Sequence, residues 1–163
     1  MKENTTYYLE ILSPDKLKYK ENKRSDFQVL ECKAKQFRYN RFLYNLVGEK
    51  WQWFDNNSWS DAKWKEYAES DMLRTFVGYI EGSPAGYYEL LKEKNSDVQI
   101  SYFGLAPPFF NMGLGGYLLS HAIDSAFKWD TKRVWVHTCT LDHPNALNNY
   151  LARGMNIFKE EVE

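Results

Sequence analysis

The sequence has few cysteines, no excess of charge of one sign and no long apolar run. Its two cysteines, Cys32 and Cys139, form neither a Cys-x-x-Cys pair nor a metal-ligand spacing, so we expect reduced thiols and no metal site. The formal net charge of −1 argues against a nucleic-acid partner, because such affinity rests largely on a basic surface. No stretch approaches the ~20 apolar residues of a membrane span, and the chain does not begin with the apolar run of a signal peptide. These absences predict a cytoplasmic protein with no membrane partner.

Repeats, low-complexity tracts and linkers are absent as well. The 163 residues are therefore expected to form one domain, residues 1–163, that is large enough to bury a core. Aromatic residues, by contrast, are abundant, at 17% of the chain, with six Trp and twelve Tyr. Because aromatic rings bury large areas, these side chains can build the core or line a substrate site. The sequence leaves both interpretations open.

Runs of alternating apolar and polar residues predict strands, and apolar residues three or four positions apart predict helices. We expect strands at residues 5–12, 27–32, 73–81, 85–91, 98–105 and 133–140, a last strand over 155–158, and helices at residues 37–47, 58–70, 114–127 and 145–153. Pro144 is expected in the first turn of the last helix, and the lysine-rich residues 16–24 as a solvated connection. A helix separates strand 98–105 from strand 133–140, which favours parallel pairing between them. The sequence thus predicts an α+β domain around one mixed sheet.

A glycine cluster between strand 98–105 and the long helix is the most informative stretch of the chain. Gly113, Gly115 and Gly116 stand at the expected helix start, where glycine lets the backbone approach a ligand and free N–H groups attract an anion. This arrangement predicts a pyrophosphate site. A P-loop would need Lys-Ser or Lys-Thr after the glycines, and a dinucleotide-binding turn would need a glycine where Leu118 stands. Neither pattern fits.

Another phosphate-binding turn does fit. Residues 110–115, Phe-Asn-Met-Gly-Leu-Gly, resemble the [Arg/Gln]-x-x-Gly-x-[Gly/Ala] motif of the GNAT superfamily of acetyl-CoA-dependent N-acetyltransferases. Leu105-Ala106-Pro107 is similar to the strand end that precedes that motif. Ala146, Tyr150 and Gly154-Met155 resemble the Ala-x-x-x-Tyr-x-x-x-Gly-Phe signature on the last helix of the family.

The resemblance covers residues 78–158, and residues 137–155 are most similar to a bacterial branch whose substrates are mostly unassigned. It implies a GNAT-like acyl-CoA N-acyltransferase fold, with a central mixed, mostly antiparallel sheet flanked by helices, and acetyl-CoA as cosubstrate. The residues that it implies for cofactor binding are Phe103, Gly104, Leu105, Asn111, Met112, Gly113, Leu114, Gly115, Gly116, Asn145 and Tyr150.

Two departures from the family pattern bear on this site. Phe110 stands where the family usually has Arg or Gln, so we expect the pyrophosphate to rest on backbone N–H groups and the helix dipole, without a basic side chain. His143 replaces a helix-start Asn that often contacts the cofactor. We expect Asn145, two residues further on, to take over this contact.

The resemblance also implies a mechanism in which an amine attacks the thioester directly in a ternary complex. Tyr150 matches the tyrosine that protonates the CoA thiolate, and the Leu105 N–H is the implied oxyanion donor, at a strand end that splays from its neighbour. Glu89 is our candidate base, with His137 as the alternative. Gln99 stands where relatives often carry Glu and cannot act as a base. No nucleophilic side chain is required, so Cys139 is expected to be an ordinary strand residue, and His121 to lie on a helix surface.

Three functions therefore stay open at this point. The first is an N-acetyltransferase acting on a primary amine of a small molecule or peptide, with a homodimer possible. The second is a catalytically silent acetyl-CoA-binding or sensing domain, which Gln99 and Phe110 favour. The third is an aromatic-rich carbohydrate- or peptide-binding module, which rests on four tryptophans: Trp51, Trp53, Trp59 and Trp64.

Overall fold

The computed structural model describes residues 3–163, which form one seven-stranded sheet in the order β2-β3-β4-β5-β6-β1-β7. The strands are β1 (Thr5–Ile11), β2 (Phe27–Glu31), β3 (Leu73–Ile80), β4 (Ser83–Lys92), β5 (Val98–Leu105), β6 (Val134–Cys139) and β7 (Asn156–Val162). The helices are α1 (Phe37–Gly48), α2 (Asp61–Ala68), α3 (Gly115–Phe127) and α4 (Ala146–Ala152), with single 3-10 turns at Pro14–Lys16, Glu49–Trp51 and Pro107–Phe109. The β5–β6 pair is parallel and the other five pairs are antiparallel. The predicted α+β class and mixed, mostly antiparallel sheet are therefore confirmed.

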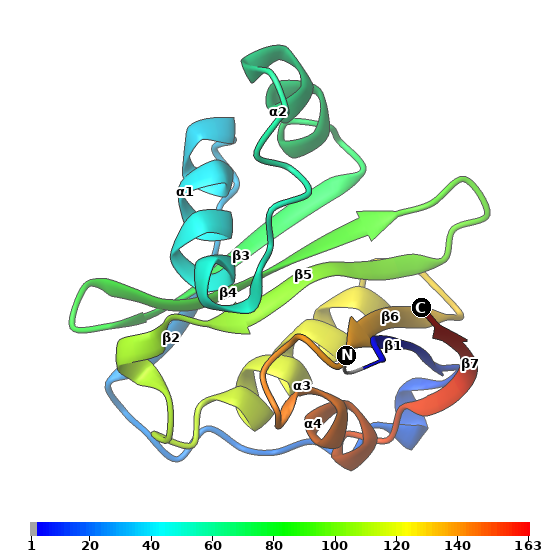
Figure 1. Ribbon diagram of the computed structural model, residues 1–163. Helices are drawn as coiled ribbons and strands as arrows, with labels where there is room; N and C mark the ends of the chain where they lie inside the picture. Colours follow the sequence, from blue (N-terminus) through cyan, green and yellow to red (C-terminus); the bar gives the residue numbers. More distant parts are fainter. Residues whose placement is uncertain (1–2) are drawn as a thin grey trace.

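The helices lie on the two sides of this sheet. Figure 1 shows α1 and α2 on one side, over β3 to β5, and α3 and α4 on the other side. The predicted apolar stripe of α3 is buried, and it faces strand residues such as Leu9, Ile100 and Val136. The α3 residues in this layer are Leu118, Leu119, Ala122, Ile123 and Ala126. Full burial of each Leu or Ile contributes roughly 1.5–3 kcal/mol, so this stripe fixes α3, and the glycine turn before it, against the sheet.

The β5–β6 pair opens soon after it begins. Pairing is limited to Val98 with Val134 and Gln99 with Trp135, although β5 continues to Leu105. Over residues 100–105 β5 therefore has a neighbour on its β4 side and none on its β6 side. The predicted splay of this strand end is confirmed, and it places a gap in the sheet beside the glycine turn.

Most element boundaries differ from the prediction by one or two residues, and three differences have a clear structural basis. The last strand runs through Val162 because β1 pairs with it along its whole length. Residues 159–161 are charged and exposed and show no alternation, so the sequence does not predict this extension. Helix α2 is shorter than predicted, since the Ser60 side chain caps it by accepting a hydrogen bond from Lys63 N at 3.2 Å. Pro144 lies in the turn before α4, which begins at Ala146. None of the described helices is long and apolar enough to cross a membrane.

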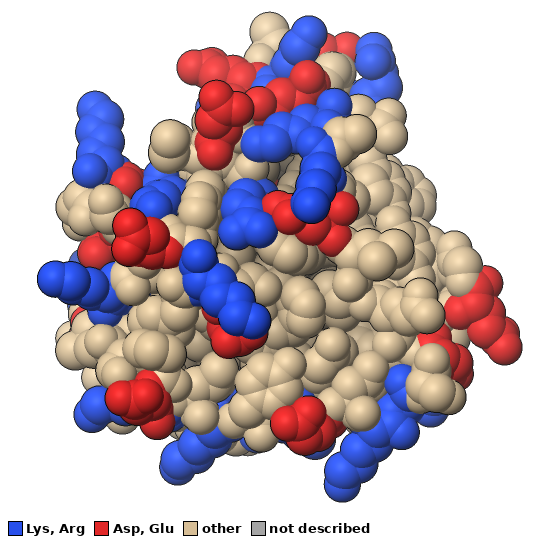
Figure 2. Space-filling model, turned by 180° about the vertical axis from the view of Figure 1, so that it is seen from behind, with Lys and Arg blue, Asp and Glu red and all other residues tan. Residues whose placement is uncertain are grey.

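The surface carries charges of both signs. On the face opposite that of Figure 1, Lys and Arg side chains alternate with Asp and Glu, most densely on the protruding part of the molecule (Figure 2). No broad basic patch gathers on this face. Positive and negative side chains, which nearly cancel in the sequence, are therefore also mixed on this face of the molecule.

Candidate active site

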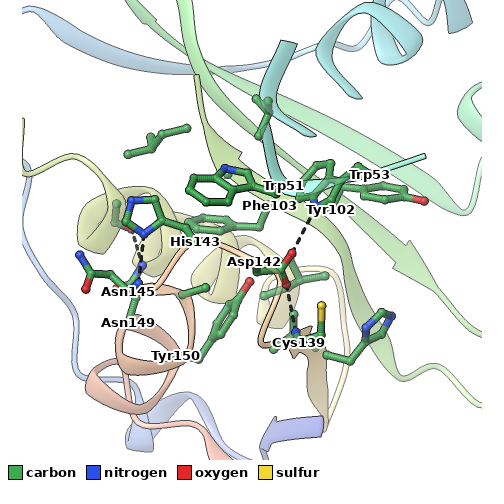
Figure 3. A pocket seen from close by; sticks show the side chains of 18 of the residues that line it. Trp51, Trp53, Tyr102, Phe103, Cys139, Asp142, His143, Asn145, Asn149 and Tyr150 are labelled. Atoms are coloured by element: carbon green, nitrogen blue, oxygen red, sulfur yellow. Dashed lines mark hydrogen bonds between the residues drawn. The ribbon is translucent and has the colours of Figure 1, made fainter. Parts of the chain in front are cut away.

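The gap between β5 and β6 opens into a cleft of about 1080 Å³, slightly above the ~300–1,000 Å³ that small-molecule sites occupy. Its walls come from β5, β6, the glycine turn, the start of α4 and the segment after α1 (Figure 3). Ten of the eleven predicted cofactor-binding residues line it: Phe103, Gly104, Leu105, Asn111, Gly113, Leu114, Gly115, Gly116, Asn145 and Tyr150. Met112 instead packs its side chain against the apolar core. One site thus brings together residues from three separate parts of the sequence.

The glycine turn has the backbone geometry that its sequence predicts. Asn111 and Gly113 have φ angles of 62° and 75°, in the left-handed region where glycine is favoured. Helix α3 then begins at Gly115 with no side-chain cap, so the N–H groups of its first turn are free for a ligand. Asn149 of α4 donates to Gly115 O at 3.1 Å, which fixes α4 against this turn.

Two cationic side chains lie at this helix start, which corrects our expectation of a site without a basic side chain. A Cβ atom added at Gly116 would meet Lys20 Cδ and Arg153 Nη1, each 2.5 Å away. The segment around Lys20 is a solvent-exposed connection, as predicted. It is also anchored at two points, because Lys20 N donates to Ser120 Oγ and Lys18 N donates to Arg153 O, each at a distance of 2.9 Å. Arg153 Nε is buried and has no hydrogen-bond partner among residues 3–163. The helix N-terminus, the free N–H groups and these two cations together fit a phosphate-bearing ligand.

Tyr150 lines the cleft from helix α4. Its side chain is 5% exposed, and its ring centre lies 6.1 Å from that of Phe103 on β5. Burial, with a smaller contribution from Asp142, raises the pKa of Tyr150 well above its ordinary value. The phenol therefore stays protonated over the whole neutral range, and it can act as a proton donor.

Aromatic rings line much of the remaining wall of the cleft. Trp53 and Tyr102 have ring centres 5.5 Å apart, and Tyr44 stands edge-on to Tyr102 at 5.3 Å. Trp51 lies against Phe110 and His143, with centroid distances of 5.9 and 5.1 Å. The segment after α1 thereby contacts both the glycine turn and the loop before α4. Phe110 thus packs against rings where the family pattern has a phosphate ligand.

The four tryptophans do not act as one surface. Trp51 and Trp53 line the cleft, whereas Trp64 is 2% exposed in the core between α1 and α2, with Trp59 packed against it. A binding module built on all four rings is therefore not what the chain forms. Both interpretations of the aromatic residues hold in part, because some rings build the core and others line the cleft.

Glu89, the candidate base, lies behind the wall of the cleft and not on it. Its side chain is 1% exposed, and its carboxylate accepts hydrogen bonds from Asn40 Nδ2 at 2.9 Å and Tyr67 OH at 2.8 Å. Burial raises the pKa of Glu89 to about 7, against the two hydrogen bonds, which lower it. Tyr67 and Ser101 do line the cleft, so Glu89 reaches it through their hydroxyl groups.

The remaining candidates take different places. His137 lines the opposite wall on β6, two residues before Cys139. Both cysteines are free, and burial raises the pKa of each thiol, which agrees with their expected passive role. His121 is not a plain surface residue as predicted, because it is half-buried against Phe76 and Tyr117 and shares a hydrogen bond with the Tyr88 hydroxyl. Within residues 3–163 no group of three His, Cys, Asp or Glu side chains is placed to hold a metal ion.

Sequence reasoning missed four residues of this site: Lys20, Tyr67, Ser101 and Arg153. Lys20 belongs to a polar connection, and no local pattern shows that this connection returns to the start of α3. Tyr67 follows Trp64 by three residues on α2, and only the packing of α2 shows what that face of the helix meets. In β5 the register against β4 shifts between Ile100 and Tyr102, so simple alternation does not show that the Ser101 hydroxyl turns toward Tyr67.

Comparison with known proteins is consistent with this site. The sequence profile of the acetyltransferase (GNAT) family matches residues 40–155. Among solved structures, a GCN5-related N-acetyltransferase from Kribbella flavida superposes with a TM-score of 0.71 at 13% identity, over 97% of this chain and 56% of that one. A GCN5-related N-acetyltransferase from Sphaerobacter thermophilus gives 0.68 at 12% identity, over 98% and 50%. An aminoglycoside acetyltransferase from an uncultured soil metagenomic sample gives 0.65 at 13% identity, over 81% and 90%.

These likenesses show the fold. The chain spans only 50–60% of the length of the first four structures that it matches. No curated protein sequence gives a significant match.

Proposed function

Because the chain belongs to the acetyltransferase (GNAT) family, we propose that it is an N-acetyltransferase that moves an acetyl group from acetyl-CoA to a primary amine of a small molecule or peptide. The observation that carries this proposal is the division of the cleft into two chemically different ends. One end has a helix N-terminus and two cations, and the other has aromatic rings and carboxylates. The first suits a pyrophosphate and the second an amine, and Tyr150 lies on the cleft wall beside Phe103 of the splayed strand.

Acetyl-CoA supplies the activated acetyl group as a thioester. The backbone N–H groups from Asn111 to Gly116 are proposed to hold its pyrophosphate, with charge supplied by Lys20 and Arg153. Phe103, Gly104 and Leu105 have no β6 partner, so their backbone groups are available to the pantetheine amides and, at Leu105, to the oxyanion. Asn145, the residue before the first turn of helix α4, also lines the cleft, and it is proposed to contact acetyl-CoA.

Tyr150 is proposed as the acid of the reaction. Its raised pKa keeps the phenol protonated at neutral pH, so it can donate to the CoA thiolate as that group leaves. The structure gives the hydroxyl no hydrogen-bonding partner within residues 3–163. The donor is therefore free for a ligand.

Glu89 is proposed as the base. An ionised carboxylate whose pKa is about 7 is matched to proton transfer near neutral pH. Its burial excludes direct contact with a substrate, so the proton must reach it through the residues that separate it from the cleft. Direct attack by the amine requires no covalent acyl-enzyme, which agrees with the raised thiol pKa of Cys139.

The acceptor end favours a positively charged amine. Three carboxylates line the cleft, those of Asp55, Asp142 and Glu163, and the rings of Trp53 and Tyr102 present faces to which a cation is attracted. The amine is bound as an ammonium ion and must then lose a proton. We further propose one domain over residues 1–163 and a cytoplasmic location, which the two free thiols support.

The experiment that tests this proposal mixes the purified chain with acetyl-CoA and a panel of amines and follows release of free CoA thiol. Turnover with any amine supports the proposal. Acetyl-CoA binding, measured by calorimetry, without turnover on mono-, di- and polyamines and on peptide amines favours the silent cofactor-binding domain. Failure to bind acetyl-CoA contradicts both functions.

A further inference from the structure

A chain of hydroxyl groups connects the buried carboxylate of Glu89 to the cleft. Tyr67 OH lies 2.8 Å from Glu89 Oε2 and 2.8 Å from Ser101 Oγ. Glu89 itself does not line the cleft, whereas Tyr67 and Ser101 do. Ser101 is therefore the cleft-side end of this chain, and Tyr67 is the link between it and the carboxylate.

The other carboxylate oxygen is held from the opposite side. Asn40 Nδ2 donates to Glu89 Oε1 at 2.9 Å and to Thr75 Oγ1 at 2.8 Å, and both Asn40 and Thr75 are buried. Both hydrogens of this amide nitrogen are thus used. The donor to Glu89 Oε1 is therefore a side chain that does not line the cleft. Only Oε2, through Tyr67, is connected to the ligand side.

No cation compensates the charge of Glu89. Within residues 3–163, the side chains that donate hydrogen bonds to its carboxylate are Asn40 from α1 and Tyr67 from α2, both of them uncharged. The titratable groups near enough to feel its charge are Tyr67, Tyr87 and Tyr102. An ionised Glu89 in this setting binds a proton readily as soon as one is delivered to it.

Resting on the proposed function, we propose that Ser101 and Tyr67 form a proton relay that carries one proton from the acceptor ammonium to Glu89. The ammonium gives a proton to Ser101 Oγ while Ser101 passes its own hydrogen to the Tyr67 oxygen. Tyr67 in turn passes its hydrogen to Glu89 Oε2. Three O–H bonds form as one N–H and two O–H bonds break. The amine becomes neutral with its electron pair free, both hydroxyls are restored, and Glu89 becomes neutral.

The relay explains why a base is buried where no substrate can touch it. Asp55, Asp142 and Glu163 on the cleft wall already attract the ammonium by charge, whereas a carboxylate one layer deeper can take its proton without adding to that binding. Tyr67 is on this view a positioning residue that acts through Ser101. Its ring also packs against Trp59 and Tyr102, which holds the hydroxyl between its two partners.

The test compares Tyr67→Phe and Ser101→Ala with the wild-type chain over pH 6 to 10. Each variant should lose about 100-fold in kcat/KM for the amine near pH 7 and recover most of it at pH 10, where the free amine arrives already deprotonated. KM for acetyl-CoA should not change. Tyr79→Phe is the matched control, because it also removes a tyrosine hydroxyl from a pair, with Tyr39 at 2.8 Å, outside the cleft. An equal loss at every pH, or no loss, overturns the relay.

A second measurement does not depend on turnover. In chains with ¹³C-labelled Glu carboxyls, the Glu89 resonance is identified by its absence in Glu89→Gln and titrated by NMR. Tyr67→Phe should raise its pKa, because a donor to the ionised form is lost, while Tyr79→Phe should leave it unchanged. An unmoved titration in Tyr67→Phe overturns the relay alone. A wild-type chain that acetylates no amine overturns the proposed function, and with it the relay as a step of transfer.

Discussion

The indole Nε1 of Trp53 donates a hydrogen bond to Asp142 Oδ1 over 3.2 Å, joining the segment after α1 to the loop before α4 (Figure 3). The other oxygen of Asp142 is held by Thr138 Oγ1 at 2.6 Å and by Cys139 N at 3.1 Å. This pair spans the cleft between the two walls that β5 and β6 leave apart. One carboxylate therefore fixes both the end of β6 and the position of the aromatic segment over the acceptor end.

Replacing Trp53 by Phe should weaken this connection while keeping a ring in place. A hydrogen bond to a charged group is worth about 1.5–3 kcal/mol, so we expect a loss of that size in the free energy of unfolding, and a higher KM for the amine. Urea denaturation and steady-state kinetics measure the two effects. Trp59→Phe serves as the control, since that indole donates no hydrogen bond within the described part of the chain, residues 3–163. An equal effect of both changes would contradict the role of the Asp142 contact.

Replacing Tyr150 by Phe should lower kcat with little change in the affinity for acetyl-CoA. The hydroxyl is proposed to protonate the leaving thiolate, and the ring, which supplies the packing against Phe103, remains. The rate of release of free CoA thiol gives kcat, and calorimetry gives the affinity for acetyl-CoA. An unchanged rate would remove Tyr150 from the acid role, and a parallel loss of affinity would assign it to binding.

Removing either cation at the start of α3 should weaken acetyl-CoA binding. Lys20→Ala and Arg153→Ala are each expected to raise the Kd roughly tenfold at low salt, the size of one charge-assisted hydrogen bond, and less at 1 M salt because of screening. Lys23→Ala is the control, because Lys23 is exposed and lies outside the cleft lining. Wild-type affinity in both cleft variants would leave the phosphate to the backbone alone.

Stability should depend on pH through Glu89. Its folded-state pKa of about 7 lies above the ordinary 4.5, so the folded chain holds this proton more tightly than the unfolded chain. The contribution to stability is present below about pH 4.5 and is lost as the pH rises through 7. Glu89→Gln does not show this loss, because an amide does not ionise over this pH range. The free energy of unfolding of Glu89→Gln minus that of wild type should therefore be larger at pH 8 than at pH 4, by roughly 3 kcal/mol.

Urea denaturation of both chains at the two pH values measures this difference. Comparing the two differences removes any constant effect of placing an amide between Asn40 and Tyr67. A pH-independent difference between the two chains would mean that Glu89 titrates normally, and it would also contradict its assignment as a base matched to neutral pH.

Local patterns predicted the parts of the fold that depend on local physics. The stripe of α3 follows from helical spacing, the turn at Asn111–Gly113 from its glycine, and the strands β3 to β5 from alternation of apolar and polar residues. The splay of β5 was expected through the family resemblance, and the register, limited to Val98 and Gln99 on β5, confirms it. These features need only short stretches of sequence, or one motif.

The rest depends on contacts between distant residues. Lys20 and Gly116 are far apart in the chain, and Ser120, a helix residue with no distinctive pattern, holds the Lys20 backbone in place. The full length of β7 depends on β1, at the other end of the sequence. The burial of Glu89 follows from α1 and α2 packing over β4 and β5 (Figure 1), and the alternation of β4 alone shows no difference between a solvated and a buried carboxylate.

The missing β6 partner of residues 100–105 has a thermodynamic consequence. The sheet is an incomplete ladder at this place, and a ligand with amide groups of its own can supply the missing rungs. Ligand binding then adds to the stability of the fold itself: by mass action, a ligand at 100 times its Kd stabilises the folded chain by about 2.7 kcal/mol. Amide hydrogens of residues 100–105 should exchange with solvent more slowly as the ladder fills, so occupancy of the cleft can be measured from the strand that borders it.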